Sequence, residues 1–197
     1  MSQGTLARTL SQLERFTNPK LELEQYATPG SIAAQLIWSA YLRGDIEGRS
    51  VVDLGAGTGV LGIGALILAA QVTFVEKDSD AVSILKRNLS GYDHYVIETT
   101  DVTSFQGRFD TVLMNPPFGA QLRHADRIFL LRAFELANTV YSIHNANSER
   151  FLRALCADHE RTIEILSTLP FDLPPQFAHH TKHRVQQRVV VCRMQTY

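Results

Sequence analysis

The sequence predicts an α/β fold, specifically a doubly wound, mostly parallel sheet of seven strands whose last strand runs antiparallel. Short runs of strand-forming residues alternate with apolar helical segments from residue 50 onward, which is the pattern of parallel strands joined by helices. A glycine-rich turn links the first of these strands to a helix. The last two strand segments, residues 162–166 and 188–194, have no helical segment between them. Because parallel neighbours need a long crossover and antiparallel neighbours do not, the last strand should be antiparallel.

Length and composition fit one domain. The chain has 197 residues, of which 45% are hydrophobic and 20% are charged, and its net charge is −1. These values are ordinary for a globular protein with a sizeable core, and the net charge alone indicates no polyanionic partner. Because we find no internal repeat and no linker, we expect a single domain over residues 1–197, with an N-terminal helical extension over about residues 1–42.

Three features bear on the cellular compartment. The longest apolar run, residues 60–70, contains two glycines and is too short to span a bilayer. The N-terminus has no apolar core of the kind found in signal peptides. Cys156 and Cys192 form no spaced metal or redox motif, which fits a reducing compartment. We therefore expect a cytoplasmic protein with no membrane partner.

The N-terminal part is predicted to hold two helices and a loop. Apolar residues at helical spacing indicate an amphipathic helix over residues 5–16. A second apolar helix is expected over residues 32–42, with Ser31 as its N-cap. Between them, residues 25–28 form either a connecting loop or a polar lid over a ligand. The residues of this segment alone favour the connecting loop.

Residues 50–76 are predicted to bind a nucleotide-like cofactor. A strand over residues 50–54 is followed by the turn 55–59, Gly-Ala-Gly-Thr-Gly, and by an apolar helix over residues 60–70. A second strand, residues 71–75, ends on Glu76. In such a unit the glycines let the backbone approach the ligand, and the acid accepts hydrogen bonds from the ribose hydroxyls.

The nature of this cofactor depends on Asp53. Gly57, Gly59 and Gly62 satisfy the dinucleotide pattern G-x-G-x-x-G, so a nicotinamide-dependent oxidoreductase is one alternative. Asp53, however, places a carboxylate at the end of the first strand, where it would repel a pyrophosphate and attract an ammonium group. S-adenosylmethionine carries an ammonium and a sulfonium, and it is the cofactor that we expect.

The remaining segments continue the alternation of strands and helices. Asp101 and Val102 lie just past the carboxyl end of the third strand. The Asp101 carboxylate could accept a hydrogen bond from an adenine amino group, or it could simply cap a loop. The expected helices cover residues 79–89 (capped by Asp78 or Ser79), 126–138 and 148–159 (capped by Ser148), and the expected strands cover residues 95–100, 109–114 and 139–143.

The fourth strand runs into the segment Asn115-Pro116-Pro117-Phe118. Two prolines cannot continue a strand ladder, so the strand ends with Asn115 at its carboxyl end, where open parallel sheets bind ligands. The Asn115 amide oxygen and the Pro116 carbonyl could accept both N–H bonds of a planar amino group, and the Phe118 ring could stack on that plane. The plain alternative is a Pro-Pro turn with Phe118 in the core.

Other candidate groups are weaker. Histidines 179, 180 and 183 have no carboxylate or cysteine nearby in the sequence to complete a metal site, so we expect no metal. Ser142 and His144 alternate on a strand and are expected not to face each other, so no hydrolase nucleophile is indicated. Two groups of basic residues are interpreted as a rim that contacts phosphates, the alternative being a solvated surface. They are Arg123, His124, Arg127 and Arg132, and Lys182, Arg184, Arg188 and Arg193.

Several of these segments together carry a resemblance to a known family. The chain resembles the class I S-adenosylmethionine-dependent methyltransferases that modify exocyclic amino groups. It is more closely similar to the methyltransferase-like protein five family, whose eukaryotic member makes N6-methyladenosine in small-subunit ribosomal RNA. The matching segments are 23–28 (LEQYxT), 53–61 (DLGxGxGVL), 114–119 (MNPPFG), 140–144 (VYSIH) and 172–174 (DLP), where x marks a position outside the pattern.

The resemblance implies roles for individual residues. Gln25 and Thr28 would contact the cofactor, Glu76 would hold its ribose, and Asp101 would meet its adenine amine. Asn115 and Pro116 would bind the target N6. Glu76 stands where the family pattern has Asp, which is a conservative departure. The full set of expected cofactor residues is Gln25, Thr28, Asp53, Gly55, Gly57, Thr58, Gly59, Val60, Glu76, Asp101, Val102 and Asn115, and the expected catalytic segment is Asn115, Pro116, Pro117 and Phe118.

The expected function is therefore transfer of a methyl group from S-adenosylmethionine to the N6 of adenosine in RNA, with ribosomal RNA as the expected partner. A protein glutamine N5-methyltransferase is the alternative enzyme, because a side-chain amide also presents an NH2 group. The eukaryotic enzyme works with a small zinc-binding activator protein, so the resemblance also implies a partner of that kind. The tail around Lys182 is less lysine-rich than in the eukaryotic pattern.

Overall fold

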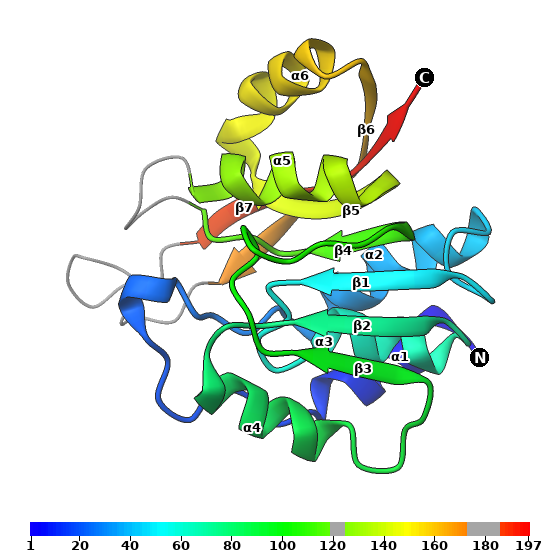
Figure 1. Ribbon diagram of the computed structural model, residues 1–197, viewed down its shortest axis with the longest axis vertical. Helices are drawn as coiled ribbons and strands as arrows, with labels where there is room; N and C mark the ends of the chain where they lie inside the picture. The colour runs from blue at the N-terminus through cyan, green and yellow to red at the C-terminus, as the bar shows by residue number, and fades with distance from the viewer. Residues whose placement is uncertain (119–124, 173–185) are drawn as a thin grey trace.

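The structure is a computed structural model that describes residues 1–118, 125–172 and 186–197. These residues form a mixed seven-stranded sheet in the order β3-β2-β1-β4-β5-β7-β6 (Figure 1). Neighbours from β3 to β5 are parallel, and β7 is antiparallel to both β5 and β6. The predicted α/β sheet with an antiparallel last strand is confirmed. The strands are β1 Ser50–Leu54, β2 Gln71–Val75, β3 Tyr95–Glu98, β4 Phe109–Met114, β5 Ala137–Asn145, β6 Arg161–Asp172 and β7 Gln186–Thr196.

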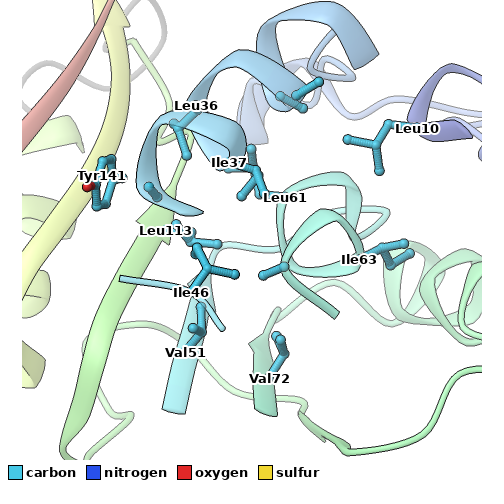
Figure 2. Packing of buried hydrophobic residues seen from close by; sticks show 14 of the residues in the cluster. Leu10, Leu36, Ile37, Ile46, Val51, Leu61, Ile63, Val72, Leu113 and Tyr141 are labelled. Atoms are coloured by element: carbon cyan, nitrogen blue, oxygen red, sulfur yellow. The ribbon is translucent and has the colours of Figure 1, made fainter. Parts of the chain in front are cut away.

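Helices cover both faces of the sheet. Successive strand side chains point to opposite faces, so Val51 joins one buried cluster and Val52 joins the other. Figure 2 shows α1, α2 and α3 packed on the first face, with Leu10, Leu36 and Ile63 among the side chains that meet there. The helices are α1 Gln3–Ser11, α2 Gly30–Leu42, α3 Val60–Ile67 and α4 Ser79–Asn88 on that side, and α5 Ala125–Leu136 and α6 Glu149–Asp158 on the other, with short 3-10 turns η1 Leu21–Leu23 and η2 Ala146–Ser148.

Several boundaries differ from the sequence prediction. Helix α1 ends at Ser11, not at residue 16, and the chain beyond it turns so that the backbone N–H of Glu14 donates to Asn88. The predicted Ser31 cap is wrong, because Pro29 occupies the N-cap position of α2 and makes no side-chain cap bond. Helix α3 ends at Ile67 because Ala69 takes a positive φ of 64° before β2 begins. Strands β6 and β7 are longer than predicted because they pair with each other along most of their length.

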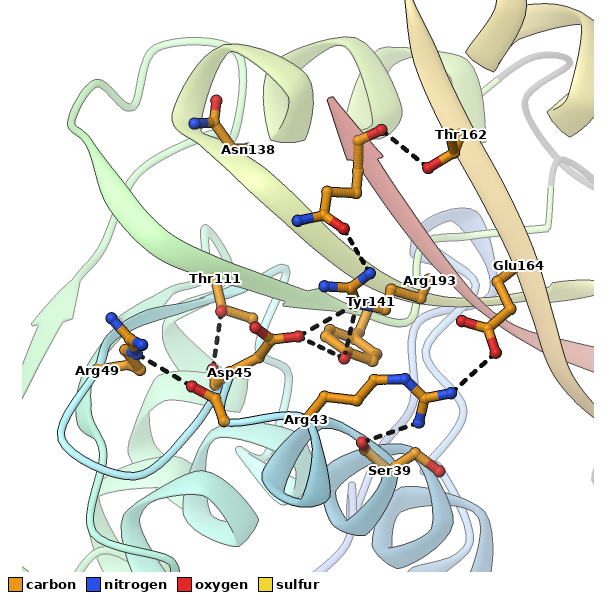
Figure 3. Close-up of polar contacts among 12 residues, drawn as sticks. Ser39, Arg43, Asp45, Arg49, Thr111, Asn138, Tyr141, Thr162, Glu164 and Arg193 are labelled. Atoms are coloured by element: carbon orange, nitrogen blue, oxygen red, sulfur yellow. Dashed lines mark hydrogen bonds and ion pairs between the residues drawn. The ribbon is translucent and has the colours of Figure 1, made fainter. Parts of the chain in front are cut away.

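A polar network ties the connection between α2 and β1 to the other half of the sheet (Figure 3). The Tyr141 hydroxyl on β5 donates to Asp45 Oδ2 at 2.7 Å, and Arg193 Nε on β7 donates to the same oxygen at 3.1 Å. The Thr111 hydroxyl on β4 donates to the Asp45 carbonyl. Three neighbouring strands are thereby joined to one loop, which fixes β4 relative to β5 and β7.

The carboxyl ends of β1, β2, β3 and β4 meet at one edge of the sheet. Gly55, Glu76, Asp101 and Asn115 follow these four strands, so the topology brings the segments singled out in the sequence to one place. Ligands of open α/β sheets bind at this edge. None of the helices that the structure describes is long and apolar enough to cross a membrane.

Candidate active site

A cavity of about 270 Å³ lies at the carboxyl edge of the sheet. It is bordered by the loops after the first four strands and by the segment before α2. Most of the predicted site residues line it, whereas Gly59, Pro116 and Phe118 do not. The predicted residues that line the cavity are Gln25, Thr28, Asp53, Gly55, Gly57, Thr58, Val60, Glu76, Asp101, Val102, Asn115 and Pro117.

The glycine turn forms the floor of this cavity. Gly57 has a φ of 56°, and its N–H donates to Glu76 Oε2 at 2.8 Å. Gly59, with a φ of 92°, is the N-cap of α3. Both conformations are costly for a residue with a side chain. A side chain on Gly57 would also collide with the Phe16 ring. The turn therefore keeps the backbone open toward a ligand while holding the start of α3.

Glu76 is fixed at the end of β2 by two backbone groups. Its Oε2 accepts from Gly57, and its Oε1 accepts from the N–H of Asp78 at 2.8 Å. The side chain is largely buried, and burial raises the pKa of this carboxyl. Each carboxylate oxygen has more than one lone pair, so Glu76 can still accept hydrogen bonds from a diol in the cavity.

Asp53 lies beneath the start of α3. Its Oδ2 accepts a hydrogen bond from the backbone N–H of Gly62 at 2.7 Å, and the residue is 2% exposed. Burial raises the pKa of Asp53 to about 7. The third glycine of the dinucleotide pattern, Gly62, thus donates to an acid and packs against Phe74. A carboxylate at this position suits a cationic group better than a pyrophosphate.

Asp101 caps a loop at the border of the cavity. Its Oδ1 accepts from the backbone N–H and the hydroxyl of Thr103, and its Oδ2 pairs with Lys77 at 3.2 Å. The N–H of Thr103 and these other contacts lower the pKa of Asp101. Asp101 therefore caps a loop and also borders the cavity, next to the buried side chain of Val102.

The segment before α2 is more than a connecting loop. Gln25 Nε2 donates to Asp78 Oδ2 at 2.6 Å, and Gln25 Oε1 accepts from the backbone N–H of Lys20. Thr28 Oγ1 accepts from Asn115 Nδ2 at 2.8 Å. Gln25 and Thr28 are both buried and line the cavity. The segment is the connecting loop that the residues alone indicated, and it also forms one wall of the cavity.

Asn115 presents one free acceptor. Its Nδ2 is bound to Thr28, whereas its buried Oδ1 has no hydrogen-bond partner among the described residues. The neighbouring carbonyl of Pro116, which the sequence suggested to be open, accepts from the Tyr26 hydroxyl at 3.2 Å. A carbonyl oxygen has two lone pairs, so one remains for another donor.

The ring of Phe118 packs against two other aromatic rings. Its centroid lies 5.0 Å from that of Tyr26 and 5.9 Å from that of Phe171. Tyr26 and Phe171 also meet, with their planes nearly perpendicular. Phe118 is half-buried and packs against the core through these rings. The alternative from the sequence, in which Phe118 is a core residue, therefore describes part of its surroundings.

Sequence reasoning missed three rings around the cavity, namely Phe16, Tyr26 and Phe129. Phe16 approaches Gly57, and Phe129 of α5 approaches Gly55. Ile128 of α5 also lines the cavity and is 44% exposed. Tyr26 was part of a segment that carried the resemblance. No local pattern indicates that Phe16 and Phe129 meet the glycine turn, or that Tyr26 lines the cavity.

The expectation about Ser142 and His144 is wrong. Residues two apart on a strand point to the same face, and Ser142 Oγ lies 2.6 Å from His144 Nε2. Both side chains are fully buried and neither lines the cavity. Burial lowers the pKa of His144 to about 3, so the imidazole is neutral. A buried pair of this kind has no access to a substrate, and it gives no reason to assign a hydrolase.

Only part of the basic rim lies within the described residues. Arg132 donates to the Thr103 carbonyl and pairs with Glu135, and Arg193 is bound to Asp45, so these two are engaged within the fold. Arg127 and Arg188 are exposed.

In residues 1–118, 125–172 and 186–197, no group of three His, Cys, Asp or Glu residues could hold a metal. Gly119, Arg123, His124, Leu173, Pro174, His179, His180, Lys182, His183 and Arg184 lie outside the described residues.

Comparison with known proteins identifies the family. The family model described as the methyltransferase small domain matches residues 32–140. The rRNA N(6)-adenosine-methyltransferase METTL5 of Danio rerio is 34% identical to this chain, over 96% of the chain and 96% of its own length. The chain belongs to the METTL5 family. Its Drosophila melanogaster relative, rRNA N(6)-adenosine-methyltransferase Mettl5, is also 34% identical, over 89% of this chain and 87% of its own length.

The fold agrees with METTL5 membership. The solved structure of PH1948 from Pyrococcus horikoshii superimposes with a TM-score of 0.93 and 45% identity, and the match covers 100% of this chain and 98% of that one. The resemblance stated from the sequence is thus confirmed, and the chain is a methyltransferase. The nicotinamide-dependent oxidoreductase is set aside.

Proposed function

We propose that this chain transfers a methyl group from S-adenosylmethionine to the exocyclic N6 of adenosine in RNA, and that the RNA is ribosomal. The observation that carries the proposal is the Asn115 amide, whose buried oxygen is left without a partner among the described residues at the edge of the cavity. That oxygen suits the N–H of an amino group. The names of the METTL5 relatives give the same reaction for those proteins.

The cavity fits the proposed donor in its chemistry. Asp53 can face the ammonium group, Glu76 the ribose hydroxyls, and Asp101 the adenine amine. Gly57 keeps the backbone close to the ligand, and Gln25 closes one wall. When bound, S-adenosylmethionine supplies an electrophilic methyl group on its sulfonium sulfur. The remaining residues expected to line the donor are Thr28, Gly55, Thr58, Gly59, Val60 and Val102.

Asn115 and Pro116 form the acceptor half of the site, which binds the amino group that receives the methyl group in this proposal. The lone pair of adenine N6 is delocalised into the ring, so this nitrogen is a poor nucleophile. Asn115 Oδ1 and the Pro116 carbonyl accept its two N–H bonds, localise the lone pair and aim it at the methyl group. With the donor bound, the nitrogen–carbon bond would form as the sulfur–methyl bond breaks, S-adenosylhomocysteine would be the leaving group, and the proton lost from N6 would pass to water. Positioning and preorganised hydrogen bonds then account for the rate.

Phe118 and Pro117 complete the acceptor side in this proposal. Phe118 stacks on the flipped base, which is worth roughly 1–3 kcal/mol per base in single-stranded recognition. Pro117 keeps the backbone extended after Pro116, so that the carbonyl stays outside the strand ladder. A glutamine side chain also offers an NH2 group, but it has no flat ring on which Phe118 could stack.

Partner and location remain predictions. RNA is the expected partner, and contacts with its phosphates are assigned to the exposed Arg127 and Arg188 and to the basic residues outside the described part. A small zinc-binding activator is expected from the family resemblance alone. A cytoplasmic location and one domain over residues 1–197 are likewise predictions.

A labelling experiment tests the proposal. The protein is incubated with radiolabelled S-adenosylmethionine and separate RNA, DNA and protein fractions, and the labelled RNA is digested to nucleosides for mass spectrometry. We expect label in RNA as N6-methyladenosine. Label in protein as N5-methylglutamine would identify the alternative enzyme. No transfer to any fraction, despite tight binding of the donor, would contradict the activity for the chain acting alone.

A further inference from the structure

We propose that Thr28 and Tyr26 are positioning residues for the acceptor, because one short segment holds both of the groups that receive the adenine amino protons. The inference rests on the proposed function and deepens it. Thr28 is bound to the side chain of Asn115, and Tyr26 is bound to the carbonyl of Pro116. Neither residue touches the reacting nitrogen in this scheme. Each acts through the group that it holds.

The contact of Thr28 sets the direction of the Asn115 amide. An amide has a donating end and an accepting end, and only the accepting end is useful for binding an amino group. Thr28 Oγ1 accepts from Asn115 Nδ2 at 2.8 Å, and this leaves Oδ1 as the end without a partner in the described chain. A rotated amide would present N–H groups to the substrate's amino group. A hydroxyl can also donate, so Thr28 holds the amide in this direction only when its own proton goes to another acceptor. Asn115 then presents its oxygen to a substrate that donates.

Thr28 can hold this direction while it faces the cavity. Its hydroxyl oxygen accepts from Asn115, and its hydroxyl proton can still be donated to a ligand. If the Thr28 hydroxyl donates its proton to an acceptor in the cavity, its oxygen can still accept from Asn115 Nδ2. The side chain is 8% exposed and lines the cavity, so it lies between the donor and acceptor halves of the site.

The contact of Tyr26 fixes the second acceptor. Its hydroxyl donates to the Pro116 carbonyl at 3.2 Å, which occupies one of the two lone pairs of that oxygen. Its ring lies against Phe118 and Phe171, so the hydroxyl cannot move without disturbing the ring that is expected to stack on the base. Tyr26 thus sets the position of the carbonyl and of Phe118 together.

The same segment is also bound to the part of the cavity that is assigned to S-adenosylmethionine. Gln25, next to Tyr26, donates to Asp78, whose own backbone N–H donates to Glu76. Residues 25–28 therefore join the part of the cavity assigned to S-adenosylmethionine to the Asn115 amide and the Pro116 carbonyl. A misplacement of about 1 Å at a reacting centre can cost on the order of a hundredfold in rate, so small changes in this segment should be visible in kcat.

The test compares Thr28→Val, Thr28→Ser and Tyr26→Phe in the full chain, with an RNA that the parent protein methylates and with saturating S-adenosylmethionine. Thr28→Val keeps the shape and removes the acceptor, so kcat should fall about ten- to a hundredfold. Thr28→Ser keeps the hydroxyl and should restore most of the rate. Tyr26→Phe removes one neutral hydrogen bond and should lower kcat by roughly two- to tenfold. Thr73→Val and Tyr92→Phe, which remove hydroxyls that lie away from the cavity, are the matched controls.

A second measurement does not depend on turnover. The side-chain NH2 of Asn115 is followed by NMR in protein labelled with ¹⁵N-asparagine, bound to S-adenosylhomocysteine, with Asn115→Asp used for assignment. We expect this signal to shift and exchange faster in Thr28→Val and to stay in place in Thr28→Ser. The Thr73→Val control should leave it unchanged.

The outcomes separate the inference from the proposed function. A parent protein that methylates no RNA contradicts the proposed function for the chain acting alone, and the NMR measurement then still decides the contact between Thr28 and Asn115. An active parent with unchanged kcat and an unmoved amide signal in Thr28→Val overturns the inference. Equal losses in Thr28→Val and Thr28→Ser also overturn it, because they would trace the defect to volume and not to the hydrogen bond.

Discussion

The carboxylate of Asp53 at the end of β1 accepts a hydrogen bond from the backbone N–H of Gly62 in α3, at 2.7 Å. The residue is 2% exposed, and burial raises the pKa of Asp53 to about 7 despite this hydrogen bond. A cationic ligand beside Asp53 stabilises the ionised carboxylate. The pH of the solution therefore sets the charge of a buried acid that lines the cavity.

The first prediction concerns cofactor affinity. Because ligand binding favours ionised Asp53, affinity for S-adenosylmethionine should rise with pH up to about 7, by as much as about tenfold per pH unit below the pKa. The α-amino group of the ligand titrates near 7.7–8.0 in model compounds, so titration calorimetry between pH 5.5 and pH 7 is carried out with that group protonated. Asp53→Asn should bind more weakly and show a flat profile. A sloping profile in that variant would assign the effect to another residue.

The second prediction concerns stability. The folded protein holds the Asp53 proton more tightly than the unfolded chain, whose Asp has a pKa near 3.9. The contribution of Asp53 to the free energy of unfolding is therefore greatest below pH 4 and declines as the pH rises from about 4 to 7, by an amount on the order of a few kcal/mol. Asp53→Asn cannot ionise, so it should gain stability relative to the parent over this range. Urea unfolding at pH 4.5 and pH 7.5 measures the difference, and parallel pH dependence in the two proteins would refute it.

The third prediction separates binding from folding at Glu76. Glu76→Ala removes the acceptor proposed for the ribose hydroxyls and should weaken binding of S-adenosylmethionine by tenfold or more, as expected for hydrogen bonds to a charged group. It also leaves the N–H groups of Gly57 and Asp78 without this partner, at about 1–3 kcal/mol each when buried. Glu76→Gln keeps one acceptor oxygen and should therefore be more stable than Glu76→Ala. Glu98→Gln, an exposed acid at the end of β3, serves as the control.

Calorimetry and thermal melting decide the outcome for Glu76. Unchanged affinity in Glu76→Ala would remove this residue from the cofactor site. Tight binding of NAD by the parent protein would contradict the choice of cofactor altogether.

The fourth prediction concerns Asn115. Asn115→Ala should lower the rate of methyl transfer by on the order of 10²–10³, the typical loss for one preorganised hydrogen bond. Cofactor affinity should change little, because Asn115 is assigned to the acceptor and Asp53 and Glu76 to the donor. Single-turnover methylation with saturating cofactor gives the rate, and calorimetry gives the affinity. Full rate in Asn115→Ala would rule out the mechanism proposed for N6.

The fifth prediction concerns Phe118. Phe118→Leu keeps an apolar side chain of similar volume but loses stacking, so the defect should appear mainly as a higher KM for RNA, equivalent to roughly 1–3 kcal/mol. Phe105→Leu, on the opposite face of the sheet, is the control for loss of a ring. If Phe118→Leu lowers thermal stability and leaves the KM unchanged, then its contacts with Tyr26 and Phe171 are its whole role.

The strands and the site segments could be predicted because their signals are local. The bounds of β1, β2 and β4 match the sequence prediction, since each is a short apolar run ended by a glycine turn, an acid or two prolines. The antiparallel β7 followed from the missing crossover. The contact between Ser142 and His144 was also within reach, because the two-residue period of a strand places both on one face.

Only the tertiary structure decided which partners the site residues take. Thr28 and Asn115 are 87 positions apart in sequence, and so no local pattern relates them. Likewise, periodicity could not show that the rings of Phe16 and Phe129 approach the glycine turn. The sequence by itself determined that Asp53 lies at the end of a strand, that Glu76, Asp101 and Asn115 follow strands, and that these strand ends share one edge. Which lone pairs remain open there depends on how distant segments pack, because each hydrogen bond is fixed by three-dimensional distance and direction and not by separation along the chain.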